Sequence, residues 1–193
     1  MKQTLGAVLA GGVGSRMKGA KVCADLHGQP LIAYPLAALA EAGLEAVVCA
    51  KPGDRLPPLD APTLLEPERP RHPLSGIVAA LRAGEGRPIV AVACDLPFVA
   101  PGLLRLLADA PDRLVAPKLD GRLQPLLARY EPSLLPELEA ALEREEPLAR
   151  TVEALEPRLL GEDDLAPFGD PHRLLFNVND PDDLSRAEAL LAS

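Results

Sequence analysis

Short, continuously apolar runs alternate along the chain with segments whose apolar residues recur at helical spacing. The apolar runs predict strands at 5–10, 46–50, 63–65, 89–93, 114–116, 126–130 and 174–176, because they are too short for helices. Helical spacing predicts helices over 31–42, 77–83, 102–107, 132–143 and 148–155. Pro30 is expected to open the first of these. Asp180 is expected to cap a last helix that begins at Pro181.

This alternation indicates the fold class. Strands without polar positions are buried on both faces, and strands that alternate with helices form a mostly parallel sheet between helical layers. The pattern therefore predicts an α/β fold. A chain of 193 residues suits one well-buried core, so we expect a single domain over 1–193. The Pro-rich stretch 52–73 is expected to be a loop over the sheet edge.

Composition narrows the classes of function. The net charge of −8 argues against a general nucleic-acid binder, which needs clustered Lys and Arg. No apolar stretch approaches the ~20 residues of a membrane span, and the N-terminal run is wrongly flanked for a signal peptide. The three cysteines form no CxxC pair, which favours reduced thiols. We therefore expect a cytoplasmic protein.

A glycine-rich loop with three cations, at 11–21, follows the first strand. Its glycines let backbone N–H groups approach an anion closely. Arg16, Lys18 and Lys21 are concentrated here in an otherwise acidic protein, which suits a polyphosphate. The spacing matches neither a Walker A loop nor a dinucleotide fingerprint. A flexible loop with solvated cations is the alternative, and phosphate binding is the better hypothesis.

Two further strand ends carry polar groups. Asp95 follows the apolar run 89–93, so its carboxylate should lie at the carboxyl edge of the sheet, where α/β proteins bind ligands. It is suited either to Mg²⁺ beside a triphosphate or to capping a turn. Asn177 and Asn179 alternate after the predicted strand 174–176; they either face the site together or order the turn into the last helix. The three histidines lack ligand spacing, and Cys94 has no evident base, so neither suggests a catalytic group.

The motifs, taken in order, resemble those of the molybdenum cofactor guanylyltransferase family. The match covers nearly the whole chain. It comprises Leu-Ala-Gly-Gly at 9–12 followed by Arg16-Met17 and Lys21, Gly-Gln-Pro-Leu at 28–31, His-Pro-Leu-Ser-Gly at 72–76, Cys-Asp-Leu-Pro-Phe at 94–98, Gln-Pro-Leu at 124–126 with Tyr130, and Asn-Val-Asn-Asp-Pro-Asp-Asp at 177–183.

The resemblance implies a Rossmann-like, three-layer nucleotidyltransferase fold and a set of site residues. Arg16, Lys21 and Asp95 would be catalytic, with Asp95 on Mg²⁺. Asn177 and Asn179 would lie near the acceptor or the metal. The nucleotide would contact Leu9, Ala10, Gly11, Gly12, Arg16, Lys21, Glu66 and Asp95.

Three positions depart from the family pattern. Ala20 replaces an Asp, Lys18 replaces a Gly, and Cys49 or Ala50 stands where an Asn is common. The last change affects contacts to the base or ribose. None of the three removes a phosphate or metal group.

By the same resemblance, the substrates would be GTP and the molybdopterin cofactor, with transient docking to proteins of cofactor biosynthesis or to recipient proteins. Three alternative functions share this fold and differ in the substrates: CTP with molybdopterin, GTP with a cobalamin precursor, or a sugar phosphate as acceptor. An alternative from another class of function is a nucleotide-binding regulatory protein without activity. The retention of Lys21 and Asp95 favours an enzyme.

Overall fold

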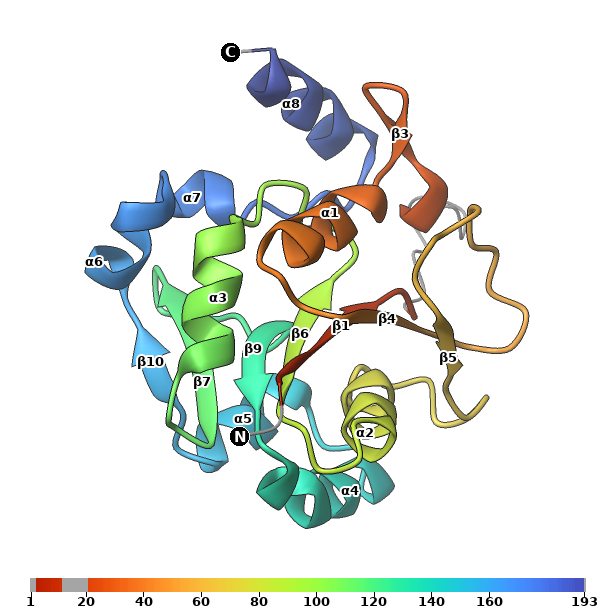
Figure 1. Cartoon of the computed structure of the whole chain (residues 1–193), viewed down its shortest axis with the longest axis vertical. Helices are drawn as coiled ribbons and strands as arrows, with labels where there is room; N and C mark the ends of the chain where they lie inside the picture. Colours follow the sequence, from red (N-terminus) through yellow and green to blue (C-terminus); the bar gives the residue numbers. More distant parts are fainter. Residues whose placement is uncertain (1–2, 12–20, 193) are drawn as a thin grey trace.

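A central sheet runs through the molecule, with helices on both of its faces (Figure 1). The computed structural model describes residues 3–11 and 21–192. Within these residues the sheet has eight strands, in the order β10-β7-β9-β6-β1-β4-β5, with β8 paired to β7. The strands are β1 Leu5–Leu9, β4 Ala46–Ala50, β5 Thr63–Leu65, β6 Ile89–Ala93, β7 Leu114–Leu119, β8 Arg122–Leu123, β9 Leu127–Tyr130 and β10 Arg158–Leu160.

The sheet is mostly parallel, as the sequence predicts. β1 is parallel to both of its neighbours, β4 and β6, and the pairs β4–β5 and β7–β10 are parallel as well. β9 runs antiparallel to β6 and β7, and β8 runs antiparallel to β7. Every residue of β1 and β6 is buried, because helices cover both faces. The predicted α/β fold is confirmed.

Two apolar cores lie on opposite faces of this sheet. Val8 of β1 packs with α1 and α3, whereas Leu9 on the other side of the strand packs with α2, α4 and α5. Figure 1 shows these two groups of helices on either side of the strands. The helices are α1 Ala33–Glu41, α2 Leu74–Ala83, α3 Pro101–Asp109, α4 Leu135–Glu143, α5 Leu148–Ala154, α6 Glu162–Leu165, α7 Pro171–Leu174 and α8 Pro181–Leu191.

A third, small core attaches the C-terminal helix to a hairpin. The hairpin consists of β2 Asp25–Leu26 and β3 Gln29–Pro30. Leu26 and Leu31 pack with Val178 and Ala187. Asp180 caps α8 as predicted, accepting a hydrogen bond from the backbone N–H of Asp183 (2.9 Å). This packing holds the segment just before α8 close to the hairpin and to Lys21, which precedes the hairpin in the chain.

Two predicted elements are wrong. Pro30 does not open a helix but closes the β2–β3 hairpin, whose turn places His27 and Gly28 at positive φ. Residues 174–176 are not a strand, because α7 extends to Leu174. Asp170 accepts from the backbone N–H of His172 (2.8 Å), and a proline follows Asp170 at the first helical position. This start signal is the same as that of α8.

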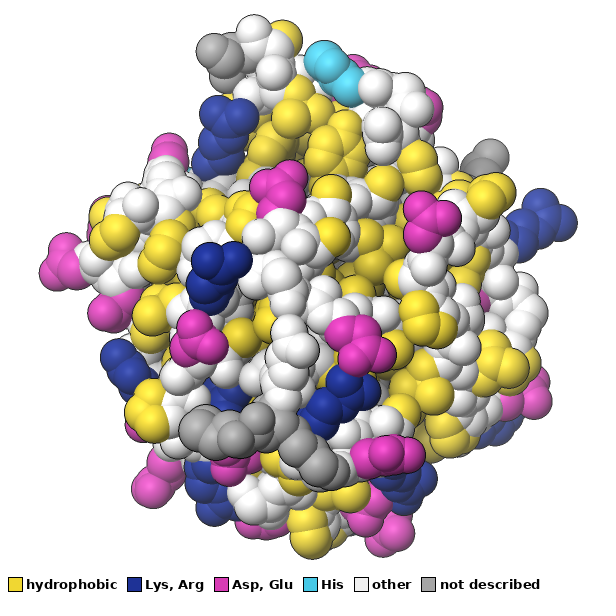
Figure 2. Space-filling view, in the orientation of Figure 1, with side chains coloured by type: hydrophobic (Ala, Val, Ile, Leu, Met, Phe, Trp, Pro, Cys, Tyr) yellow, Lys and Arg dark blue, Asp and Glu magenta, His cyan; other side chains and the backbone are white. Residues whose placement is uncertain are grey.

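Two further features are the distribution of charged side chains on the surface and the length and apolarity of the helices. Figure 2 shows basic and acidic side chains interspersed over the viewed face, rather than gathered into one basic patch. In the part of the chain that the structure describes, no helix is both long and apolar enough to cross a membrane.

Candidate active site

The carboxyl ends of four neighbouring strands form one edge of the sheet. Leu9 at the end of β1 lies in register with Ala93 of β6 on one side and Cys49 of β4 on the other, and Cys49 is in register with Leu64 of β5. The residues that follow these strands are therefore brought to a common edge. In α/β sheets this edge is where ligands bind.

Lys21, Asp95 and Asn179 meet at this edge, and we call them the Lys21 cluster. The Lys21 ammonium group donates to Asp95 Oδ2 in a close ion pair, and to Asn179 Oδ1 at 2.8 Å. A backbone hydrogen bond from Val178 N–H to the Asp95 carbonyl (3.0 Å) fixes the C-terminal segment against the end of β6. The cluster thus joins residues that lie 74 and 158 positions apart in the chain.

The second carboxylate oxygen of Asp95 is the unusual atom in this cluster. Oδ1 is buried and has no hydrogen-bond partner among the described residues. Buried acceptors are normally paired, so an unpaired carboxylate oxygen inside a candidate site suits a cation. Mg²⁺ prefers oxygen ligands and usually takes only one or two carboxylates from the protein. Asp95, with the Asn179 amide oxygen nearby, fits such an ion.

The two asparagines differ in their contacts. Asn179 belongs to the Lys21 cluster, whereas the Asn177 amide donates to the Leu175 carbonyl (3.2 Å) and so orders its own turn. Asp95 contacts a lysine rather than the backbone of a turn. A role for Asn177 near the acceptor remains a prediction.

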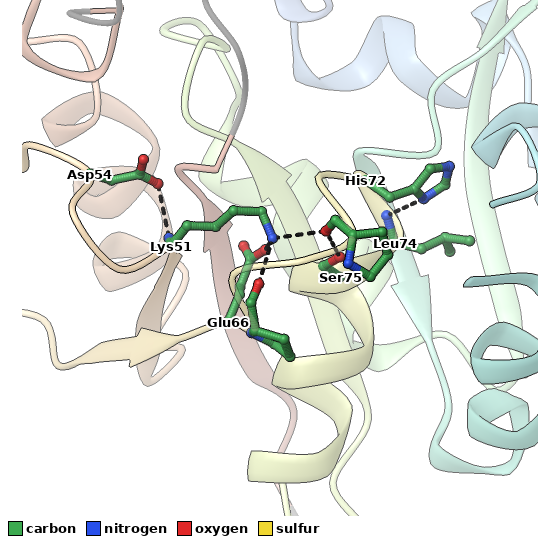
Figure 3. A network of polar contacts seen from close by, with 8 residues as sticks. Lys51, Asp54, Glu66, His72, Leu74 and Ser75 are labelled. Atoms are coloured by element: carbon green, nitrogen blue, oxygen red, sulfur yellow. Dashed lines mark hydrogen bonds and ion pairs between the residues drawn. The ribbon is translucent and has the colours of Figure 1, made fainter. Parts of the chain in front are cut away.

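A second charged pair, Lys51 with Glu66, lies at the ends of β4 and β5 (Figure 3). Both residues are buried, with 6% and 4% of their surfaces exposed. Lys51 Nζ lies 3.1 Å from Glu66 Oε2, and it donates to the carbonyl groups of Pro67 (2.8 Å) and Pro70 (3.1 Å). The Ser75 hydroxyl also donates to the Pro70 carbonyl (3.0 Å). The ammonium group is therefore fully engaged.

Two glycines leave room for the Glu66 carboxylate. A Cβ at Gly11 or at Gly76 would stand 2.9 Å from Glu66 Oε1, closer than non-bonded atoms normally approach. Gly11 begins the glycine-rich loop and Gly76 lies in the first turn of α2. Glu66 is therefore in direct contact with the start of the predicted phosphate loop.

Burial controls the electrostatics of this edge. It raises the pKa of Glu66, and the ion pair and hydrogen bond with Lys51 oppose that rise. Burial also raises the pKa of both Cys49 and Cys94 to about 12. A thiol with that pKa stays protonated at neutral pH, so neither cysteine is a nucleophile.

A comparison with known proteins places these features in a family. The model of the MobA-like NTP transferase domain matches residues 6–159. The chain belongs to the MobA-like NTP transferase family. It is therefore a nucleotidyltransferase, which agrees with the resemblance noted in the sequence.

Relatives of the chain agree with this assignment. The chain is 34% identical to a molybdenum cofactor guanylyltransferase of Cereibacter sphaeroides, over 96% of each protein. It is 29% identical to a probable molybdenum cofactor guanylyltransferase of Pelotomaculum thermopropionicum, over 98% of this chain and 94% of the relative.

Solved structures show the same fold. Molybdopterin-guanine dinucleotide biosynthesis protein A from Archaeoglobus fulgidus superimposes with a TM-score of 0.83 at 30% identity, covering 98% of this chain and 99% of that one. A 2-C-methyl-D-erythritol 4-phosphate cytidylyltransferase from Thermus thermophilus gives 0.70 at 22% identity, covering both chains fully. At that identity the second match concerns the fold alone.

The structure places most of the site residues expected from the sequence. Leu9 and Ala10 are buried at the sheet edge, where Ala10 N–H donates to the Cys49 carbonyl (2.9 Å). Gly12, Arg16 and Lys18 lie outside the described residues. Sequence reasoning missed Lys51. Its signal was its position directly after the buried strand 46–50, at the carboxyl edge.

The burial of the Lys51–Glu66 ion pair leads to a prediction about the stability of the protein. Lys51→Met should lower the free energy of unfolding by about 3–5 kcal/mol at neutral pH, because it leaves the buried Glu66 carboxylate without a cation. In the variant the pKa of Glu66 in the folded state lies further above its ordinary value of 4.5. The folded state then holds a proton that the unfolded chain releases, so stability should fall as pH rises above about 4.5.

Chemical denaturation at a series of pH values measures this effect. Arg82→Met is the control, because Arg82 and its partner Glu139 form a pair whose arginine side chain is 59% exposed. It should cost at most about 1 kcal/mol. A Lys51→Met variant as stable as Arg82→Met at every pH would contradict the prediction.

Proposed function

We propose that the protein transfers GMP from GTP to the terminal phosphate of the molybdenum–molybdopterin cofactor, giving the guanine dinucleotide cofactor and pyrophosphate. The observation that supports this most is the Lys21 cluster, in which a cation and a carboxylate with an unpaired buried oxygen meet at the ligand-binding edge of a nucleotidyltransferase. The names of relatives at about 30% identity support the choice of donor and acceptor.

The edge of the sheet suits a nucleoside triphosphate laid across the strand ends. Asp95 follows β6 and Glu66 follows β5, and these strands are three positions apart in the sheet, or about 14 Å. A nucleoside triphosphate spans a distance of that order. The triphosphate would lie toward Lys21, Asp95 and the loop that carries Arg16, and the nucleoside toward Gly11 and Glu66.

The proposed reaction needs no general base. An oxygen of the acceptor phosphate, already ionised at neutral pH, attacks the α-phosphorus of GTP. The bond from this phosphorus to the bridging oxygen breaks, and that oxygen leaves with pyrophosphate. Lys21 would exchange its carboxylate partner for phosphate oxygens, where its positive charge stabilises the transition state. Asp95 and Asn179 would hold Mg²⁺, which supplies charge neutralisation to the triphosphate when bound.

The decisive assay measures pyrophosphate release with purified protein, Mg²⁺, GTP and molybdopterin cofactor. We expect release only when donor and acceptor are both present, with GTP far better than CTP, ATP or UTP. A preference for CTP, or release that requires a different acceptor, would keep the family and overturn the proposed substrates. Nucleotide binding without release with any acceptor would instead indicate a regulatory protein.

Asp95→Asn tests the metal-binding role. It removes the charge at the unpaired oxygen, and we expect kcat to fall by at least about 100-fold, with partial recovery at high Mg²⁺ concentration. Asp112→Asn is a matched control, because Asp112 forms a surface pair with Arg158 and should leave the rate unchanged. Turnover of the Asp95 variant close to that of the control would exclude the role.

A further inference from the structure

The Lys51–Glu66 pair has features that a purely structural ion pair does not need. It lies at the ligand-binding edge, and Lys51 Nζ lies 3.1 Å from one oxygen of the carboxylate, Oε2. The other oxygen, Oε1, lies on the side of Gly11 and Gly76, where the absence of side chains keeps it uncovered by a Cβ. The carboxylate is thus bound by Lys51 at Oε2 and bordered by two glycines at Oε1.

The chemistry of a nucleotide decides which part of it can face Glu66. A carboxylate repels a polyphosphate unless a cation lies between them, and the Lys51 ammonium group already contacts Glu66 and two backbone carbonyl groups. A nucleoside, in contrast, offers N–H and O–H donors, which a charged carboxylate binds strongly. The nucleoside end of a bound nucleotide therefore suits Oε1.

We propose that Lys51 is a positioning residue for the nucleoside end of the site: its ammonium group keeps the Glu66 carboxylate charged and turned toward Gly11 and Gly76, so that Oε1 accepts hydrogen bonds from the donor nucleoside. The inference rests on the proposed function. Lys51 itself does not touch the nucleotide. It acts through Glu66.

The surroundings of Glu66 make this support necessary. Burial raises the pKa of the carboxyl group, and the negative charge of Asp54 on the neighbouring loop raises it further. Cys49 of β4 also faces it but stays neutral, with a pKa of about 12. Gly76 of α2 and Gly11, which follows β1, also border the carboxylate and carry no charge. Among these groups Lys51 alone favours the ionised form.

The test compares GTP with inorganic tripolyphosphate. Both ligands contain a triphosphate, but only GTP carries a nucleoside. Binding of GTP and of inorganic tripolyphosphate, both with Mg²⁺, is measured by calorimetry for the full-length wild type and for Lys51→Gln, Lys51→Arg and Glu66→Gln. Lys51→Gln should raise the Kd for GTP about 10–100-fold at pH 7 and leave the Kd for tripolyphosphate unchanged. Lys51→Arg keeps the charge and should stay close to the wild type.

The pH profile adds a readout that a structural role would not move. Because burial raises the pKa of Glu66, Glu66 in the Lys51→Gln variant should lose its proton only as pH is raised, so the ratio of the variant's GTP Kd to that of the wild type should fall with rising pH. Glu66→Gln should show the same loss of GTP affinity without this recovery. Arg82→Gln, which alters an ion pair between α2 and α4, should change the Kd of neither ligand.

The outcomes separate this inference from the proposed function. Equal GTP affinity in wild type and Lys51→Gln, or a parallel loss for GTP and tripolyphosphate, would overturn the inference alone. A wild type that binds no GTP would overturn both. Should Lys51→Gln fail to fold, Glu66→Gln and Lys51→Arg still compare a carboxylate lost with an ion pair kept.

Discussion

The contact between Lys21 and Asp95 is the interaction on which the site depends. A carboxylate at the end of a buried strand is poorly solvated and requires a cation. In the described structure Lys21 supplies that cation, and Asn179 supplies a second acceptor for the ammonium group. The C-terminal segment can reach Lys21 because Val178 is packed into the small core between α8 and the β2–β3 hairpin. The position of the last helix is therefore part of the architecture of the site.

A second charged pair repeats this principle three strands away. Lys51 and Glu66 are more deeply buried than Lys21 and Asp95, and Gly11 and Gly76 border the carboxylate. The parallel sheet explains why both pairs face the same edge, since the carboxyl ends of neighbouring parallel strands align. The two pairs define the proposed ends of the nucleotide.

The sequence predicted most of the fold because its strongest signals are local. The strands β1, β4 and β6 are continuous apolar runs, and Asp180-Pro181 marks the start of α8. Failures occurred where tertiary contacts override local pattern. The apolar residues 174–176 resemble a strand, but Leu174 and Leu175 are buried against α3 and its neighbours as part of the large core. Pro30 is compatible with a helix start and with a hairpin, and the turn at His27-Gly28 selects the hairpin.

The same distinction applies to the site. Motif spacing pointed to Lys21, Asp95 and Asn179 individually, and the structure brings these three together. It did not separate Asn179 from Asn177, because only the path of the turn determines which amide points to Lys21. Lys51 was missed because a lysine after a strand is normally solvated, and its burial depends on the loop that folds back over it from Pro67 to Pro70.

The most direct test of the account is a crystal structure of the protein with GTP and Mn²⁺ as an anomalous substitute for Mg²⁺. We expect an anomalous peak beside Asp95 Oδ1, with the Lys21 ammonium group moved onto phosphate oxygens. A metal bound away from Asp95, or a triphosphate that leaves the Lys21–Asp95 contact intact and lies elsewhere, would contradict it.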